Sequence, residues 1–381
     1  MKTILLVRLG MSATAAALLL TGCGAGSEGG GGAAREDDAG PIAVAANDEA
    51  CEVDASELPA GTHTFSVTNN GSQVTEFYVY AEGDRVMGEV ENIAPGLTRE
   101  LIVELAAGEY QTACKPGMIG DGIRNDLSIT GEAERLSDDE LLAQATEDYS
   151  RYVQSQTVAL TEKNDEFVAA ILAGDIPGAK ALFPIARTYW ERIEPVAEIF
   201  GDLDPAIDGR EGDQAEGEEF TGWHKLEYDL WVLGDISASG PIAEKLQADV
   251  AEVVELATTT ELSPIQLANG AKELLDEIAT GKITGEEDRY SHTDLWDFAA
   301  NLEGSEASVQ ALRPALEERD PELVAALDAE FANATAALEV HRAGDGWQLH
   351  NELTPDQLQV LSDAINALAE EVAKVAGVVA G

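Results

Sequence analysis

The pattern of apolar residues changes completely near Gly131, and this change limits the folds open to the chain. Before Gly131, the segments "HTFSVTNNG" and "TEFYVYAEGD" alternate between apolar and polar residues, as strands with one buried face do. After it, Ala, Leu and Glu dominate long amphipathic segments that are interrupted at Pro or Gly. We therefore predict a small all-β sandwich at residues 46–132 and an all-α bundle at residues 137–381.

Short signals mark where individual elements begin and end. The sequence Asn69-Asn70-Gly71 follows an alternating segment and predicts a hairpin turn. The capping box Ser137-Asp138-Asp139-Glu140 predicts the start of a long helix, and Gly174 predicts its end.

The N-terminus is typical of an exported protein. Lys2 and Arg8 precede the apolar stretch "MSATAAALLLTG", which ends at Cys23 and is shorter than the about 20 residues of a transmembrane helix. The sequence Leu20-Thr21-Gly22-Cys23 resembles a bacterial lipobox, so we predict a signal peptide at residues 1–23 and lipidation of Cys23. That anchor would hold the protein at the outer face of the cytoplasmic membrane. An ordinary signal peptide cleaved nearby is the alternative. Residues 24–45 are Gly-rich and acidic and predict a flexible tether.

The charge of the chain excludes one class of partner. The sequence has 72 acidic and 23 basic residues, a net charge of −49. Binding to nucleic acid needs clustered Lys and Arg, so we expect no nucleic-acid partner. A strong negative field concentrates cations instead, although solubility alone would also account for it.

The helical part contains clusters of residues that serve as metal ligands. Glu191 and Glu194 are spaced to share one helical face, and so are His224 and Glu227. Further candidates are Asp202, Asp204, Asp208, Glu286, Glu287, His292 and Asp294. Carboxylates held close together need protons, cationic partners or a metal. Hard ions such as Fe³⁺, Ca²⁺ and Mn²⁺ prefer oxygen ligands, and one imidazole favours a transition metal. For His224 and Glu227 alone, an ion pair with a neighbouring Lys or Arg is the alternative.

The β-region has a cysteine pair that allows two interpretations. Besides Cys23, the chain contains Cys51 and Cys114, and an exported protein can form disulfides. Cys114 ends a predicted strand and Met118 follows in the next loop, as in a copper site, but blue copper needs two imidazoles. The two possibilities are a Cys51–Cys114 disulfide and a copper site. The copper ligands would be Cys51, Glu76, Cys114 and Met118.

Long stretches of the chain resemble one family. "ENIAPG" and "LAAGEYQTAC" in the β-region are similar to the cupredoxin-like domain of EfeO/EfeM-type components of Efe iron uptake systems. "YWERIEPVAEIFGDLDPAIDGR", "GWHKLEYDLW" and "GKITGEEDRYSHTDLWDFAANLEGS" are similar to the imelysin-like helical domain of that family. The resemblance implies a cupredoxin-like sandwich followed by two packed four-helix bundles.

The resemblance also implies a function and a site. The helical domain would bind iron, with zinc as a substitute, through Glu191, Glu194, Asp208, His224, Glu227 and Glu287. Glu287 is chosen over Asp294 as the last acid. The β-domain would use copper to oxidise Fe²⁺ or to pass metal on. The implied partners are an Efe-type permease and a secreted haem peroxidase.

Two other functions are alternatives. Imelysin-like proteins were once grouped with peptidases, but the zinc-protease pattern His-Glu-x-x-His is absent from the sequence. A polysaccharide-binding lipoprotein would need a bridging cation, because a polyanion is repelled by this chain.

Overall fold

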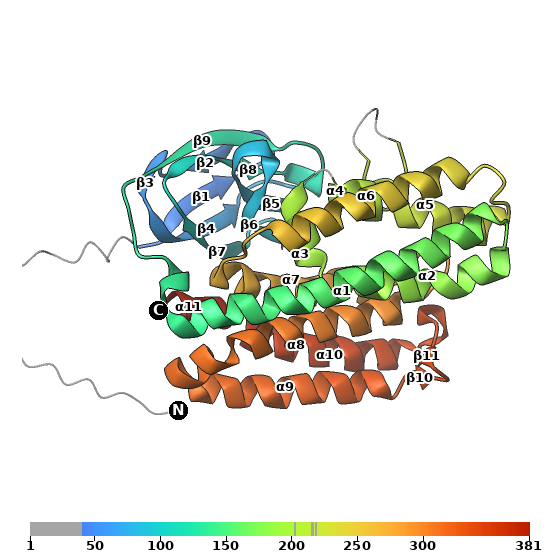
Figure 1. The fold of residues 1–381 in the computed structure, drawn as a ribbon. Coiled ribbons are helices and arrows are strands. Elements are labelled where there is room, and N and C mark those ends of the chain that lie inside the picture. Colours follow the sequence, from blue (N-terminus) through green and yellow to red (C-terminus); the bar gives the residue numbers. More distant parts are fainter. Residues whose placement is uncertain (1–39, 202, 215–216, 218) are drawn as a thin grey trace, which may run out of the picture. The chain divides into compact units, whose positions relative to one another are not determined.

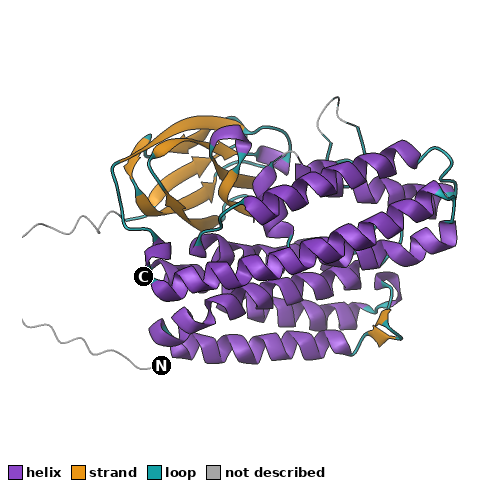
Figure 2. Cartoon of the chain, in the orientation of Figure 1, coloured by secondary structure: helices purple, strands orange, loops and turns teal. Residues whose placement is uncertain are grey.

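The first part of the chain forms two packed β-sheets (Figures 1 and 2). The structure is a computed structural model that describes residues 40–381 except 202, 215, 216 and 218. One sheet has the order β2 (Cys51–Val53), β1 (Ile42–Ala46), β4 (Gly61–Asn69), β7 (Thr98–Leu105). The other has the order β3 (Glu57–Pro59), β9 (Ile123–Thr130), β8 (Gly108–Cys114), β5 (Thr75–Tyr80), β6 (Val86–Ile93).

Alternating side chains fill the space between these sheets. Phe65 on β4 and Phe77 on β5 are fully buried, with ring centroids 5.4 Å apart. The first strand, β1, begins at Ile42, although the sequence analysis placed residues up to 45 in the tether. Val44 and Ala46 of this strand are buried and pair in parallel with β4, so burial of these two residues extends the sheet into that segment.

The predicted hairpin at Asn69-Asn70-Gly71 is wrong, because β4 and β5 belong to different sheets. Asn69 instead holds a corner at which the chain crosses from one sheet to the other. Its Nδ2 donates to the carbonyls of Gln73 and Ile93, both at 2.7 Å, and its Oδ1 accepts the N–H of Gly71 at 2.8 Å. The chain bends at residues 71–73, and the long-range bond from Asn69 to Ile93 closes the corner.

The helical part contains long helices that run side by side (Figure 1). Its helices are α1 (Glu140–Leu172), α2 (Ile176–Glu191), α3 (Glu194–Ala197), α4 (Leu203–Asp208), α5 (Gly222–Tyr228), α6 (Gly240–Thr259), α7 (Pro264–Thr280), α8 (Asp294–Arg319), α9 (Pro321–Glu339), α10 (Pro355–Val372) and α11 (Val375–Ala380). A small hairpin joins β10 (Arg342–Ala343) to β11 (Gly346–Trp347). Helix α1 packs on α2, α6 and α8, while α8 also packs on α7 and α9 and α10 packs on both of these. The predicted fold class, a β-sandwich followed by an all-α domain, is confirmed.

The ends of α1 follow from local chemistry. Asp139 caps the helix by accepting the N–H groups of Leu141 at 2.8 Å and Leu142 at 3.2 Å. The cap therefore lies two residues later than the predicted Ser137. Gly174, with φ of 70°, follows the last turn, as predicted.

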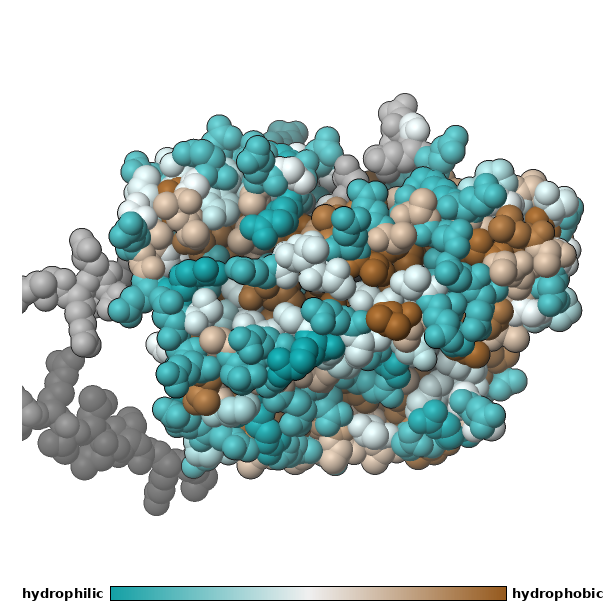
Figure 3. All heavy atoms as spheres, in the orientation of Figure 1, coloured by the Kyte–Doolittle hydropathy of each residue, from teal (hydrophilic) through white to brown (hydrophobic). Residues whose placement is uncertain are grey.

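Residues 40–381 form one compact unit in which strands and helices touch. Arg99 on β7 pairs with Asp276 on α7 at 3.0 Å, and Asn269 on α7 donates to the carbonyl of Ile102 at 2.9 Å. The face drawn in Figure 3 is mostly hydrophilic, with apolar residues in separate patches. Among the described helices, none has the length and hydropathy needed to cross a bilayer.

Candidate metal centre

Carboxylates from three helices meet in the core of the helical domain. Glu191 ends α2, Glu194 opens α3 and Asp208 ends α4. One oxygen from each lies within 4.8 Å of the other two. Glu191 is completely buried, and Glu194 and Asp208 are only 6% and 9% exposed. The structure thus brings together three of the predicted ligands.

Glu191 and Glu194 reach this point by a route that their spacing did not predict. They do not share one continuous helix, because α2 ends at Glu191 and α3 begins at Glu194. The break falls at residues 192–193, just before Pro195, which has no N–H to offer the carbonyl of Glu191. Asn301 on α8 then holds the two side chains together, donating to Glu191 Oε2 at 3.1 Å and to Glu194 Oε2 at 3.2 Å.

His224 lies beside Asp208 because α5 approaches α4 closely. The approach requires Gly222, whose φ is +74° and whose missing Cβ would lie 2.0 Å from the carbonyl oxygen of Ile207. His224 is 1% exposed. Its Nε2 is 3.3 Å from Asp208 Oδ1 and 3.4 Å from Glu287 Oε1. One face of the centre is therefore an imidazole nitrogen between two carboxylates.

The other ring nitrogen of His224 faces a second pair of carboxylates. Nδ1 is 3.3 Å from Glu227 Oε2 and 3.9 Å from Asp288 Oδ1. Glu227 Oε1 accepts the N–H groups of Tyr290 and Ser291 at 3.0 and 2.7 Å, and the Ser291 hydroxyl at 2.8 Å. Because Glu227 is fixed in this way, it orients the imidazole as the partner of a metal-binding histidine does.

The structure distinguishes the two candidates for the last acid. Glu287 is 3% exposed and belongs to a group with Asp208 and His224 whose ligand atoms lie within 4.8 Å of one another. Asp294 begins α8 and accepts the N–H of Asp288 at 3.2 Å. The position of Glu287 therefore agrees with the choice made from the sequence, although its role as a ligand stays a prediction.

A completely buried arginine lies at the centre of these acids, and the sequence analysis missed it. Arg187 on α2 is 0% exposed and has five carboxylate partners: Glu191, Asp208, Glu287, Asp288 and Asp297. Its Nη2 lies 3.0 Å from Glu287 Oε1. In the sequence, the spacing of four residues between Arg187 and Glu191 indicates an ion pair on one helical face. Such pairs are common on exposed helices and do not indicate a buried cation.

A second buried cation, Lys282, was also missed. It lies in the turn Lys282–Thr284 between α7 and α8 and is 0% exposed. Its Nζ is 3.2 Å from Glu277 Oε2, 3.4 Å from Glu191 Oε2, 3.6 Å from Glu194 Oε2 and 3.7 Å from Glu287 Oε2.

The cations determine which acids are ionised. Burial alone would raise the pKa of Asp208, but Arg187 and the hydrogen bond with His224 outweigh burial and lower this pKa below its usual value. The pKa of Glu287 is lowered in the same way, against burial, by Lys282 and Arg210. Burial raises the pKa of Asp288 to about 7, with only partial compensation from Arg187. The centre therefore combines ionised carboxylates with others that hold protons near neutral pH.

The donor set fits a hard cation. It offers carboxylate oxygens with one imidazole, which suits iron, whereas structural zinc sites favour sulfur and nitrogen in a closed tetrahedron. Among the described residues, Arg187 Nε, Asp288 Oδ1 and both carboxylate oxygens of Asp297 are buried without a hydrogen-bond partner. These buried groups can still donate or accept hydrogen bonds next to the predicted ligands.

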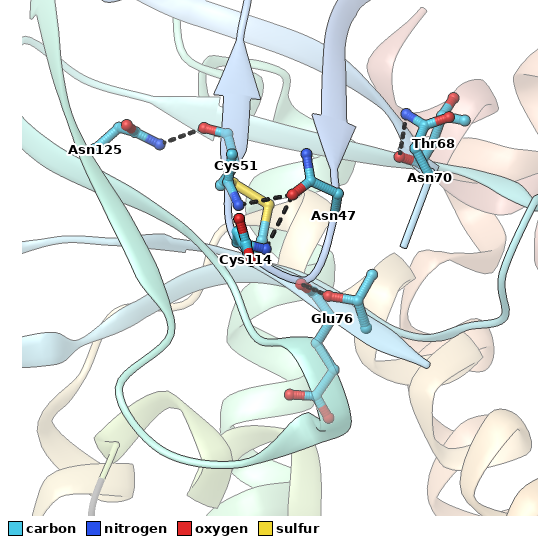
Figure 4. The surroundings of a disulfide bond; sticks show 10 residues. Asn47, Cys51, Thr68, Asn70, Glu76, Cys114 and Asn125 are labelled. Atoms are coloured by element: carbon cyan, nitrogen blue, oxygen red, sulfur yellow. Dashed lines mark hydrogen bonds between the residues drawn. A yellow bond between two sulfur atoms is a disulfide. The ribbon is translucent and has the colours of Figure 1, made fainter. Parts of the chain in front are cut away.

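The cysteines of the β-domain do not fit the copper site that the resemblance implies. Cys51 and Cys114 form a disulfide with a Cα–Cα distance of 5.5 Å, so neither sulfur is a thiolate ligand. Glu76 is 4% exposed and accepts the hydroxyl of Tyr78 at 3.2 Å. Its side chain points away from the disulfide (Figure 4), and Met118 is 38% exposed on the following turn.

The disulfide makes a direct prediction about thiol content. A Cys23→Ser variant, purified under oxidising conditions and denatured without reductant, should show no free thiol. Reduction should release two, because Cys51 and Cys114 are then the remaining cysteines. Thiol titration with a chromogenic disulfide measures both states. Two thiols before reduction would contradict the disulfide. The double variant Cys23→Ser, Cys51→Ser should show one thiol in either state, because only Cys114 remains.

Known proteins are similar to this chain over most of its length. The sequence profile of the imelysin family matches residues 145–375, and that of the cupredoxin-like domain matches residues 10–123. The chain is 39% identical over 350 residues to proteins called "Iron uptake system component EfeO" from Escherichia coli (strain K12) and Shigella flexneri. These alignments cover 90% of this chain and 92% of each relative.

The chain belongs to the EfeO family. The match extends over both the β-sandwich and the helical domain, so the family resemblance seen in the sequence is confirmed. The predicted lipidation of Cys23, the signal peptide and most of the tether lie outside the described residues.

Proposed function

We propose that the chain is an extracytoplasmic iron-binding component of an Efe-type uptake system and holds iron at the buried carboxylate and imidazole centre. The family supports the role in iron uptake. The main support for this site is the position of His224, whose two ring nitrogens face two separate pairs of carboxylates. Asp208 joins one of these pairs to the group of Glu191 and Glu194.

The ligand types favour iron capture over peptide hydrolysis. Fe³⁺ is a hard ion that prefers several carboxylate oxygens, and a net charge of −49 attracts it to the protein. A peptidase must admit a polypeptide to its metal. His224, Glu227 and Glu191 are at most 1% exposed, which does not favour access by a peptide.

The disulfide does not favour oxidation of Fe²⁺ by copper in the β-domain, because the two sulfurs that would bind copper are joined to each other. The β-domain is better interpreted as a structural or docking module attached to the iron-binding domain.

Delivery requires partners at the membrane. We propose an Efe-type permease as the acceptor, a secreted haem peroxidase as a further component, and a lipid anchor on Cys23. The support for these is the family membership together with the lipobox-like sequence before residue 24.

Iron titration of the full-length chain tests the proposed site. The protein, freed of metal by a chelator, is titrated with Fe³⁺ supplied as citrate, and bound iron is counted by elemental analysis. Wild-type protein should retain iron through dialysis, and the His224→Ala variant should bind it at least about tenfold more weakly, because it loses a ligand or its support.

A histidine in the β-domain provides the matched control. His63 Nε2 donates to the carbonyl of Pro59 at 2.8 Å and lies outside the centre, so His63→Ala should bind iron as wild type does. Wild-type protein without bound iron, or equal affinities for the two histidine variants, would contradict the proposed site.

A further inference from the structure

Lys282 occupies the space around which the proposed iron ligands converge. Its ammonium lies 3.4 Å from Glu191, 3.6 Å from Glu194 and 3.7 Å from Glu287, and its side chain is fully buried. A bound iron would share these three carboxylates with the lysine. Two cations held within a few ångströms of each other in a protein interior repel strongly.

The turn that carries Lys282 allows it to leave without disturbing a long helix. Lys282–Thr284 is a single turn between Gly281 and Gly285, and Gly285 has a φ of +78°. The carboxylate nearest to Lys282 is Glu277 at 3.2 Å, whose side chain is 19% exposed. Movement toward Glu277 therefore leads from the buried acids toward solvent while keeping one ion pair.

We propose that Lys282 is the counter-ion that iron displaces from the centre, and that this exchange sets the minimum affinity a cation needs in order to bind. This inference rests on the proposed function. Without metal, the ammonium neutralises part of the charge of Glu191, Glu194 and Glu287. Any metal that binds must replace the contacts between Lys282 and these three carboxylates. A cation that carboxylates bind weakly therefore does not displace the ammonium. Lys282 in this sense sets a threshold for binding without being a ligand, and it lowers the affinity of every cation alike.

Affinity measurements separate displacement from a purely structural role. Lys282→Met removes the competing charge, and the variant should bind Fe³⁺, supplied as citrate, and Mn²⁺ at least tenfold more tightly than wild type. Its metal-free form should melt at a lower temperature than wild type, and iron should restore the loss. Lys272→Met is the matched control, because Lys272 on α7 pairs with Asp276 at the surface, with its side chain 29% exposed. This control should leave both affinities unchanged.

A second measurement uses only the wild-type protein and does not depend on the variant folding. Amine acetylation followed by peptide mass spectrometry should modify Lys282 slowly in metal-free protein and several-fold faster in iron-loaded protein. Lys272 should be modified equally in both. Continued protection of Lys282 with iron bound, or weaker metal binding by Lys282→Met, would overturn the inference and leave the iron site standing. Wild-type protein that binds no iron at all would overturn the proposed function together with it.

Discussion

Replacing Arg187 by methionine should lower the free energy of unfolding of the metal-free protein by about 3–5 kcal/mol, as expected when one partner of a buried ionic network is removed. Methionine keeps much of the volume of the side chain but provides no charge. The variant leaves Asp208 and Glu191 without the cation that hydrogen-bonds to both. Urea unfolding followed by circular dichroism, in the presence of a chelator, measures the change.

An exposed arginine gives the comparison that this prediction needs. Arg313 pairs with Glu317 at 2.8 Å and with Asp328 at 2.6 Å, and its side chain is 31% exposed. Arg313→Met should cost less than about 1 kcal/mol, because exposed ion pairs contribute little. If Arg187→Met costs no more than this, the buried network does not stabilise the fold. Iron should restore part of the loss in Arg187→Met, since the metal binds the folded state and supplies positive charge.

The sequence predicted the acids of the centre better than the path of the chain between them. Glu191 and Glu194 converge as expected, but they do so across a helix break at residues 192–193. The spacing rule describes an uninterrupted helix, and it cannot include a bond from Asn301, more than one hundred residues away. The same limit explains the wrong hairpin, where a bond between Asn69 and Ile93 fixes the corner.

The buried cations could not be predicted from local patterns. Arg187 has one partner a helical turn away, and its other partners come from α4, from the loop before α8 and from α8 itself. Lys282 lies in a Gly-flanked turn that looks exposed in the sequence. An excess of acids indicates that cations or protons must be present, but only the tertiary structure shows which cations they are. Of the residues near Arg187, Asp288 and Asp297 were missed for the same reason.

The metal-free protein should lose stability as the pH rises from 5 to 8. Asp288 and Asp294 are completely buried, and burial raises their pKa values from 3.8 to about 7 and about 8. A carboxyl whose folded pKa is raised stabilises the fold fully below its unfolded pKa, and this contribution is lost as the pH rises through the folded value. The lowered pKa values of Asp208 and Glu287 act in the opposite direction, but only below about pH 4.5. Stability should therefore be greatest near pH 4–5.

This loss should amount to at least about 3 kcal/mol between pH 5 and pH 8, since each pKa unit corresponds to 1.36 kcal/mol and at least two buried carboxyls, Asp288 and Asp294, titrate across this range. Urea unfolding in the presence of a chelator, repeated at each pH, measures the slope. Asp288→Asn should reduce this slope by about one proton. Asp328 is an exposed aspartate paired with Arg313, and Asp328→Asn should leave the slope unchanged.

Iron-loaded protein should show the reverse trend over the same range, because metal ligands must lose their protons before they bind and the metal then takes the place of those protons. A metal-free stability that does not change between pH 5 and pH 8 would mean that the buried acids are already ionised in the fold. The cations Arg187 and Lys282 would then be sufficient to balance them, and the centre would have little charge left with which to hold iron.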